Sequence, residues 1–230
     1  MNGYGDCLKC KAFSKSTFAC LDSDVVTKSI TGNSISITYK KGQDVFLEDS
    51  LAKGVFCIQS GKVKIYKKCS ERNLIVGLGK NSDLLGYQAM FNGDKFGNSA
   101  KCLEDSQICF IPKKAFMSIL SSSNEMLMHL LKQSSIENHE LSNFVRELKC
   151  KNTLGRIASA LIRVSEKFGL DEDKCLNITL TRKEVSELSG TTTESAIRIL
   201  NDMKKEKVIT FHNNRIKILD MNKLLRYITG

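Results

Sequence analysis

The stretch LTRKEVSELSGTTTESAIRILNDMKKEKVI, residues 180–209, decides the fold of the last third of the chain. Apolar side chains at Val185 and Leu188 predict a first amphipathic helix that begins near Arg182, and Gly190 permits a tight turn after it. A second helix follows, with its apolar positions at the spacing of one helical face: Ala196, Ile199, Leu200 and Met203. Two short helices separated by a glycine turn indicate a helix-turn-helix.

The polar residues around this turn suit an interaction with DNA. Thr191 or Thr192 can cap the second helix, whose N-terminal end enters the major groove in proteins with this motif. Two short apolar runs, VITFHN and NRIKILD, meet at Asn213-Asn214, which favours a hairpin turn and a winged version of the motif. The residues that we expect to contact DNA are Arg182, Thr192, Thr193, Glu194, Ile197 and Arg198.

The charge of the chain agrees with a nucleic-acid partner. The formal net charge is +10, and six of the eight arginines follow residue 150. Arginine is suited to bidentate contacts with phosphate and guanine. The excess of lysine elsewhere needs no binding partner to explain it, because surface lysines also keep a protein soluble. The arginine enrichment therefore favours DNA binding by the last third of the chain.

Short strands with turn signals occupy residues 34–112. They include ISITYKKGQDVF, GVFCIQSGKVKIYKK, NLIVGLGKNSDLLG and SQICFIP. In GKVKIYK, the apolar Val63 and Ile65 alternate with Lys62 and Lys64, which is the period of a half-buried strand. We therefore expect an antiparallel barrel or sandwich in this region.

A long helix is predicted from Asn124 to about Cys150, because neither glycine nor proline interrupts this stretch. Positions that recur in alternating four- and three-residue steps form the seam of a coiled coil. These seam residues are Leu127, Leu131, Ser134, Asn138, Leu141, Val145 and Leu148. Polar Ser134 and Asn138 weaken such a seam while they help to set its register. A helix packed on its own domain is the alternative, but the narrow seam favours a homodimer.

Five further stretches carry a resemblance to a known family: YKKGQDVF, CIQSGKVKIY, SDLLGYQAMF, ICFIPKKAF and LGRIASALIRVSEKFG. With the helix-turn-helix, they resemble regulators related to the cyclic-AMP receptor protein (CRP) and the fumarate and nitrate reduction regulator (FNR). The resemblance implies an α+β transcriptional regulator that binds inverted-repeat promoter DNA as a homodimer and has RNA polymerase as a partner. The implied regions are an N-terminal cysteine segment at 1–33, a jelly-roll sensor domain of the cyclic-nucleotide-binding type at 34–123, a dimerisation helix at 124–150 and a winged helix-turn-helix domain at 151–230.

The resemblance also implies a pair of base-reading residues, Glu194 and Arg198, which lie four residues apart on one helix face. Arg198 would donate to guanine and Glu194 would accept from cytosine, which implies a G·C pair in each half-site. Thr193 and Ile197 occupy the neighbouring positions, where the CRP branch has Arg before the Glu and the FNR branch has Ser before the Arg. Neither flanking preference therefore transfers to this chain.

Cyclic AMP is not the expected effector. Family members that bind it have a Gly-Glu pair for the ribose and an Arg-Ser pair for the phosphate, whereas this chain has Gly86-Tyr87 and Asn98-Ser99. Without the carboxylate and the arginine, a buried phosphate would keep a poorly compensated charge.

Three of the nine cysteines lie in CLKCKAFSKSTFAC, residues 7–20. The whole chain has nine cysteines, an odd number, and we expect it in the reducing cytosol. Both points argue against a disulfide framework. Resemblance to the FNR branch implies that Cys7, Cys10 and Cys20 bind an oxygen-labile [4Fe-4S] cluster, with Cys109 as the fourth thiolate. Nine residues separate Cys10 from Cys20, where the FNR pattern has about five, but a longer loop closes at little entropic cost.

Other sensing chemistries remain open. They are zinc on the same four thiolates, thiol oxidation without a metal, haem with a cysteine ligand, and another small-molecule effector. None of the three histidines lies in the predicted barrel: His129, His139 and His212. The remaining cysteines share no spacing and are interpreted as small buried side chains: Cys57, Cys69, Cys102, Cys150 and Cys175.

The other functional classes have less support in the sequence. No cysteine stands in a local signature with a histidine and no phosphate-binding loop is present, so we expect no enzyme. A protein-binding adaptor is the alternative to a DNA-binding regulator. The N-terminus has no signal-peptide pattern and no window has the apolar length of a membrane span, so we expect a cytoplasmic protein without a membrane partner.

Overall fold

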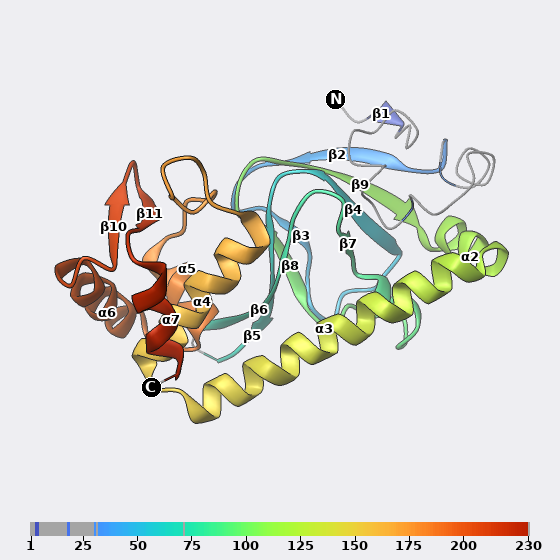
Figure 1. The fold of residues 1–230 in the computed structure, drawn as a ribbon. Coiled ribbons are helices and arrows are strands. Elements are labelled where there is room, and N and C mark those ends of the chain that lie inside the picture. The colour runs from blue at the N-terminus through green and yellow to red at the C-terminus, as the bar shows by residue number, and fades with distance from the viewer. Residues whose placement is uncertain (1–2, 5–17, 19–29, 31, 71, 230) are drawn as a thin grey trace. The chain divides into compact units, whose positions relative to one another are not determined.

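The computed structural model describes most of the chain (Figure 1). The described residues are 3–4, 18, 30, 32–70 and 72–229. They fall into two compact units, which are described separately below. Unit 1 comprises Met1–Lys67 and Gly77–His139, and unit 2 comprises Lys68–Val76 and Glu140–Gly230. Cys7, Cys10 and Cys20 lie outside the described residues.

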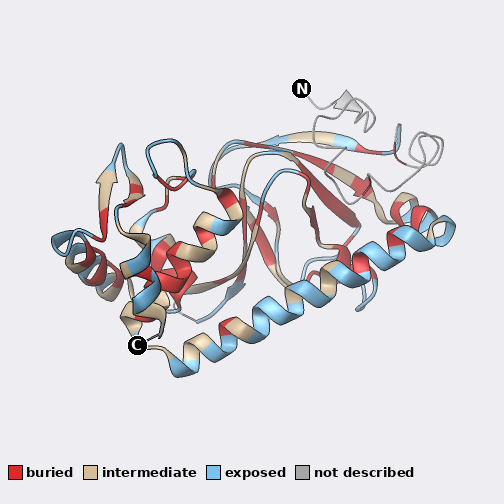
Figure 2. Cartoon of the chain, viewed as in Figure 1, coloured by how far each residue is buried: buried red, intermediate tan, exposed pale blue. Residues whose placement is uncertain are grey.

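Unit 1 is built on two antiparallel sheets whose side chains share one hydrophobic core (Figure 2). The five-stranded sheet has the order β1 (Gly3–Tyr4), β2 (Ile35–Tyr39), β9 (Ser106–Pro112), β4 (Gly54–Ser60) and β7 (Leu84–Leu85). The four-stranded sheet has the order β3 (Asp44–Phe46), β8 (Ser99–Cys102), β5 (Val63–Lys68) and β6 (Asn73–Gly79). The short helix η3 spans Tyr87–Met90, and α2 spans Lys113–Ser122.

A cluster of phenylalanine rings fills part of this core. Phe46 comes from the four-stranded sheet, Phe56 and Phe110 come from the five-stranded sheet, and Phe96 comes from the loop before β8. The ring of Phe46 stacks on the ring of Phe96 with their centroids 4.1 Å apart, and Phe56 lies 5.4 Å from Phe46. Phe110 continues the cluster 5.2 Å from Phe56. Offset aromatic contacts of this kind bury large apolar areas, which stabilises the pairing of the two sheets.

The half-buried pattern expected for β5 is wrong in one respect. Lys64, which the alternation places on the solvent side, is only 6% exposed. Its ammonium lies 5.9 Å from the ring centroid of Tyr66, whose hydroxyl donates to the carboxylate of Asp44 at 3.0 Å. Lys101 makes an ion pair with the same carboxylate at 3.4 Å. Side chains from β3 and β8 thus cover the outer face of β5, which no pattern within β5 can reveal.

Unit 2 contains the predicted helix-turn-helix and wing. Helix α4 spans Thr153–Phe168, α5 spans Arg182–Ser189, α6 spans Thr193–Lys205 and α7 spans Met221–Thr229. The wing consists of β10 (Ile209–His212) and β11 (Arg215–Ile218), paired antiparallel. The α+β class with a β-domain and a C-terminal helix-turn-helix is therefore confirmed.

Helix α3 spans Asn124–Cys150 and contributes to both units. On its first half, Met126 and Leu130 belong to the core of unit 1. Several of its apolar side chains are instead exposed: Leu127, Met128, Leu131, Ile136, Leu141 and Val145. Four of these are predicted seam positions, so the described residues of one chain leave the seam largely uncovered.

No helix in the described part of the chain has the length and apolarity that a bilayer crossing needs.

Candidate functional site

Side-chain caps fix the ends of the two helices of the helix-turn-helix. The Thr181 hydroxyl accepts from the Glu184 amide at 3.1 Å, and the Glu184 carboxylate accepts from the Thr181 amide at 2.8 Å. Gly190 ends α5 in the left-handed conformation, with φ of 59°. The Thr192 hydroxyl then accepts from the Ser195 amide at 3.1 Å, so Thr192, not Thr191, caps α6. These caps position the N-terminal end of α6.

The exposed face of α6 carries three of the predicted DNA-contacting residues. Glu194 and Arg198 are exposed, and Ile197 between them is 41% exposed. Thr193 is half-buried, and its hydroxyl lies 3.3 Å from the hydroxyl of Ser186 on α5. The exposed side of this end of α6 therefore consists mainly of Glu194, Ile197 and Arg198.

Glu194 and Arg198 are the two ionisable groups on this face, and the surroundings of each are defined. Hydrogen bonds from its own backbone amide and from the Thr192 hydroxyl hold the pKa of Glu194 below its usual value, and the positive charge of Arg72 adds to this effect. Glu194 is thus an ionised acceptor near neutral pH. The guanidinium of Arg198 lies 3.9 Å from the carboxylate of Asp202, a loose exposed pair that leaves the guanidinium donors available to a partner.

The wing holds Arg182 by an aromatic contact that the sequence analysis missed. The guanidinium carbon of Arg182 lies 3.9 Å from the ring centroid of Phe211 on β10, and the Lys204 ammonium lies 5.8 Å from the same ring. Partial burial lowers the pKa of Arg182, which stays charged at neutral pH. Asn213 and Asn214 have φ of 47° and 62°, as a two-residue hairpin turn requires. The wing thereby contacts the arginine with which α5 begins.

A second missed residue, Arg163 on α4, joins the end of α3 to the end of α5. Its guanidinium donates to the Glu147 carboxylate at 2.5 Å and to the Leu188 carbonyl at 2.7 Å, and it lies 4.5 Å from the ring centroid of Phe144. Burial lowers the pKa of Arg163, and the Glu147 carboxylate opposes this effect. Two elements far apart in the sequence are therefore held by one half-buried cation.

In unit 1, the positions that would serve a cyclic nucleotide are occupied by internal hydrogen bonds. The Tyr87 hydroxyl donates to the Glu137 carboxylate of α3 at 2.9 Å, and the Gln88 amide donates to the same oxygen at 2.6 Å. Burial and the Glu137 carboxylate raise the pKa of Tyr87. At the second position, the buried Ser99 hydroxyl accepts from the Glu48 amide at 2.9 Å. Tyr87 and Ser99, one residue from each of the two pairs, thus make hydrogen bonds within unit 1.

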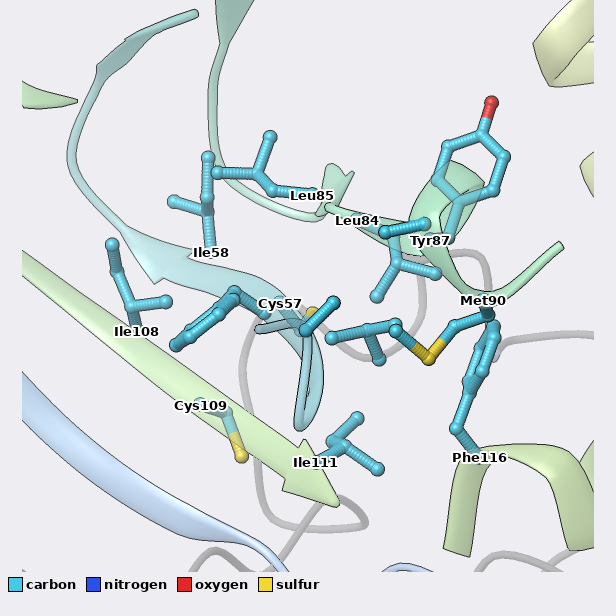
Figure 3. Packing of buried hydrophobic residues seen from close by; sticks show 14 of the residues in the cluster. Cys57, Ile58, Leu84, Leu85, Tyr87, Met90, Ile108, Cys109, Ile111 and Phe116 are labelled. Carbon is cyan, nitrogen blue, oxygen red and sulfur yellow. The ribbon is translucent and has the colours of Figure 1, made fainter. Parts of the chain in front are cut away.

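Cys109 lies in the middle of the five-stranded sheet (Figure 3). It is 2% exposed and pairs across the sheet with Ser36 of β2 and with Cys57 of β4. Figure 3 shows its sulfur on one side of the sheet, while Ile58 and Ile108 point to the other. The described residues contain no cluster of three or more histidine, cysteine, aspartate or glutamate side chains that could bind a metal.

The described parts of the N-terminal segment belong to the same unit as Cys109. Strand β1 pairs with β2, so that Gly3 stands opposite Ser36, the neighbour of Cys109. Phe18 and Ile30 are buried and belong to the same hydrophobic cluster as Cys109. The described residues on both sides of the three N-terminal cysteines therefore belong either to the five-stranded sheet or to the hydrophobic core of unit 1.

The remaining cysteines follow the sequence interpretation only in part. Cys57, Cys102 and Cys175 are buried, as expected for small apolar side chains. Cys69 and Cys150 are exposed, which corrects that interpretation for these two. Cys69 lies between β5 and β6, and Cys150 ends α3, so neither position requires burial.

A β-domain of this topology, followed by a long helix and a winged helix-turn-helix, defines a class of DNA-binding transcription regulators. Two family models match the chain: "Cyclic nucleotide-binding domain" over residues 36–123 and "Crp-like helix-turn-helix domain" over residues 155–227. The chain belongs to the CRP/FNR family of transcriptional regulators, which are not enzymes.

Curated relatives from several bacteria cover most of the chain. An anaerobic regulatory protein of Bacillus subtilis is 26% identical over 89% of this chain and 90% of its own length. A CRP-like cAMP-activated global transcriptional regulator of Mycobacterium tuberculosis is 25% identical over 83% and 86%. A fumarate and nitrate reduction regulatory protein of Vibrio cholerae is 24% identical over 81% and 75%.

Solved structures show the same fold. FixK2 from Bradyrhizobium japonicum superposes with a TM-score of 0.75 at 18% identity, over 84% of this chain and 96% of that one. A crp/fnr-family regulator from Eubacterium rectale superposes with a TM-score of 0.74 at 18% identity, over 93% and 97%. The likeness extends through both units.

The contact between Phe211 and Arg182 predicts how the wing affects DNA binding. Phe211→Ala should weaken binding to specific and random duplexes alike by about two- to fivefold, which corresponds to the roughly 0.5–1 kcal/mol of an exposed cation–π contact. Fluorescence anisotropy titrations at several salt concentrations measure this effect. Phe211→Tyr, which keeps the aromatic face, is the matched control and should bind as wild type. A changed base preference in Phe211→Ala would contradict a positioning role.

Proposed function

We propose that the chain is a homodimeric transcriptional regulator that senses oxygen, nitric oxide or redox state through a [4Fe-4S] cluster held by Cys7, Cys10, Cys20 and Cys109. The observation that carries this proposal is the position of Cys109. Cys109 is buried in the sheet to which β1 belongs, and it shares a hydrophobic cluster with Phe18 and Ile30. Thiolates in an apolar surrounding are the ligands that such clusters require.

The lengths of chain involved allow the four thiols to meet. Cys7 is three residues from Tyr4 of β1, a reach of up to about 10 Å. Cys20 is two residues from the buried Phe18, a reach of up to about 7 Å. Strand β1 is two strands away from β9, or roughly 10 Å from the row that contains Cys109. The residues present therefore fit a cluster with one ligand on the sheet.

The relatives support this sensing class without deciding it. One is named for anaerobic regulation and another for fumarate and nitrate reduction, whereas a third is named as cAMP-activated. Against cyclic AMP, Tyr87 and Asn98 stand where the ribose carboxylate and the phosphate arginine are needed. When bound, an iron–sulfur cluster supplies a centre that oxidants destroy, and this chain supplies its thiolates and its apolar cover.

The exposed seam of α3 supports the homodimer. Its apolar residues would be buried if two α3 helices paired, with Ser134 and Asn138 as polar interruptions that keep the association weak enough to be regulated. A two-fold dimer presents two α6 helices, which suits an inverted repeat with half-sites one helical turn apart. RNA polymerase is the further partner, and a regulator with these partners works in the cytoplasm.

The cluster assignment predicts that Cys109→Ser abolishes the iron–sulfur chromophore. Anaerobically reconstituted wild type should be brown and should bleach in air, because its thiolate-bound iron is open to oxidants. Iron, sulfide and zinc analysis with a visible spectrum provides the measurement. Cys102→Ser is the matched control, because Cys102 is equally buried but lies on the other sheet. Full iron and sulfide in Cys109→Ser, or a wild type that contains only zinc, would overturn the assignment.

The seam predicts that Leu141→Asp dissociates the dimer. Burying an unpaired carboxylate at the interface should cost several kcal/mol, so analytical ultracentrifugation should detect monomer at micromolar concentration. Ser142→Asp places the same charge on the neighbouring exposed position outside the seam and should leave the dimer intact. A dimeric Leu141→Asp protein would place the interface elsewhere.

The exposed pair on α6 predicts the base preference. Arg198→Ala should lose about 1–3 kcal/mol on a site with a G·C pair in each half and should flatten the preference for guanine. A randomised-site selection on wild type and variant tests this. Lys205→Ala, at the far end of α6, should leave the preference unchanged. An unaltered guanine preference in Arg198→Ala would exclude Arg198 as the base reader.

A further inference from the structure

Helix α3 presents two neighbouring faces in unit 1. Through one face, the buried Met126 and Leu130 pack on the hydrophobic core. The seam positions Leu127 and Leu131 each follow one of these residues and are exposed. Successive residues of an α-helix lie about 100° apart around its axis, so the seam is roughly a quarter turn from the packed face. The contacts of the packed face therefore determine the direction in which the seam points.

The packed face becomes polar beyond Leu130. Gln133 and Glu137 continue it at three- and four-residue steps, and both are half-buried. The Glu137 carboxylate accepts from the Tyr87 hydroxyl at 2.9 Å and from the Gln88 amide at 2.6 Å, both on one oxygen. The Gln133 amide donates to the other oxygen at 2.8 Å. The Glu137 cluster, which comprises these four residues, thus connects this part of α3 to η3 by hydrogen bonds.

Tyr87 extends the Glu137 cluster in two directions. The residue is 3% exposed and belongs to the hydrophobic core, whereas its hydroxyl points away from the apolar side chains (Figure 3). Burial and the Glu137 carboxylate raise the pKa of Tyr87, and a hydrogen bond with the Ser134 hydroxyl opposes this rise. Ser134 is itself a seam position. One side chain therefore connects the core of unit 1 to the residues that present the seam.

We propose that Tyr87 and Glu137 position the seam of α3 for pairing with a second copy of this chain. This inference rests on the proposed homodimer and adds to it two residues that lie outside the seam. Without the Glu137 cluster, α3 beyond Leu130 would be free to turn the seam away from the partner. A protein whose binding-competent orientation is populated only in part binds its partner more weakly by that fraction. The cluster therefore strengthens the dimer through the orientation of α3.

The simpler alternative is that the Glu137 cluster only stabilises unit 1. A second buried tyrosine provides the comparison. Tyr66 is 2% exposed, and its hydroxyl donates to the Asp44 carboxylate at 3.0 Å, a bond of the same kind. This bond joins β5 to β3 and involves no residue of α3. If such bonds served only the stability of unit 1, loss of either tyrosine hydroxyl would affect the dimer equally.

Dimer dissociation constants of the full-length protein, purified anaerobically and measured by sedimentation, test the proposal. Tyr87→Phe should raise the dissociation constant about tenfold, the effect of one hydrogen bond to a charged group. Glu137→Gln should act in the same direction, because one acceptor oxygen becomes an amide that faces other donors. The double variant should dimerise no more weakly than the more affected single variant, since both changes break the same hydrogen bond.

Tyr66→Phe is the matched control. It should lower the midpoint of thermal unfolding as Tyr87→Phe does, because each variant loses one buried hydrogen bond to a carboxylate. Its dimer dissociation constant should stay at the wild-type value.

The outcomes distinguish the positioning role from the homodimer itself. An unchanged dissociation constant in Tyr87→Phe, or an equal increase in Tyr66→Phe, would overturn the positioning role. Additive effects in the double variant would do the same, because they would separate Glu137 from Tyr87. A wild type that stays monomeric throughout the concentration range would instead overturn the proposed homodimer. Should Tyr87→Phe not fold, Glu137→Gln decides, since it alters a half-buried side chain of α3 and keeps its size.

Discussion

The pairing of β9 between β2 and β4 is the constraint on which the fold of unit 1 depends. The register is anchored at one end by Pro112, which lacks an amide and so fits only a position that needs no ladder donor. Residues 107–110 of β9 each have a partner on β2 and another on β4. A shift of β9 by one residue would turn Cys109 to the opposite face and bring Ile108 out of the core. The orientation of Cys109 and the packing of the core therefore depend on the same hydrogen bonds.

In unit 2 the corresponding constraint is a half-buried cation. Arg163 binds the carboxylate of Glu147 on α3 and the Leu188 carbonyl near the end of α5. Loss of either partner would leave the half-buried guanidinium with fewer acceptors, so the arrangement resists partial rearrangement. Leu148 of α3 also packs closely on the turn at Gly190, because a Cβ atom added to this glycine would lie 2.5 Å from the leucine side chain. This contact also connects the end of α3 to the turn. The end of α3 and the turn of the helix-turn-helix thus behave as one body.

Features that depend on neighbours in sequence could be predicted, and features that depend on distant pairing could not. The turn at Gly190, the cap at Thr192, the Asn213-Asn214 hairpin and the range of α3 all follow from local patterns. The burial of Lys64, the stack of Arg182 on Phe211 and the meeting of Cys57 with Cys109 each require a partner many residues away. At the candidate site, the half-buried position of Thr193 depends on Ser186, whose hydroxyl the helical periodicity of α6 alone does not reveal.

The division of α6 into a buried and an exposed face has a consequence for how such regulators diversify. Ala196, Ile199 and Leu200 are buried, whereas Glu194, Ile197 and Arg198 interleave with them on the outside. Substitutions at the exposed positions leave the apolar packing untouched, so a duplicated gene can change its operators in single steps without passing through an unstable protein. Selection for a new set of target genes and selection for a folded domain act on different residues of the same thirteen-residue helix.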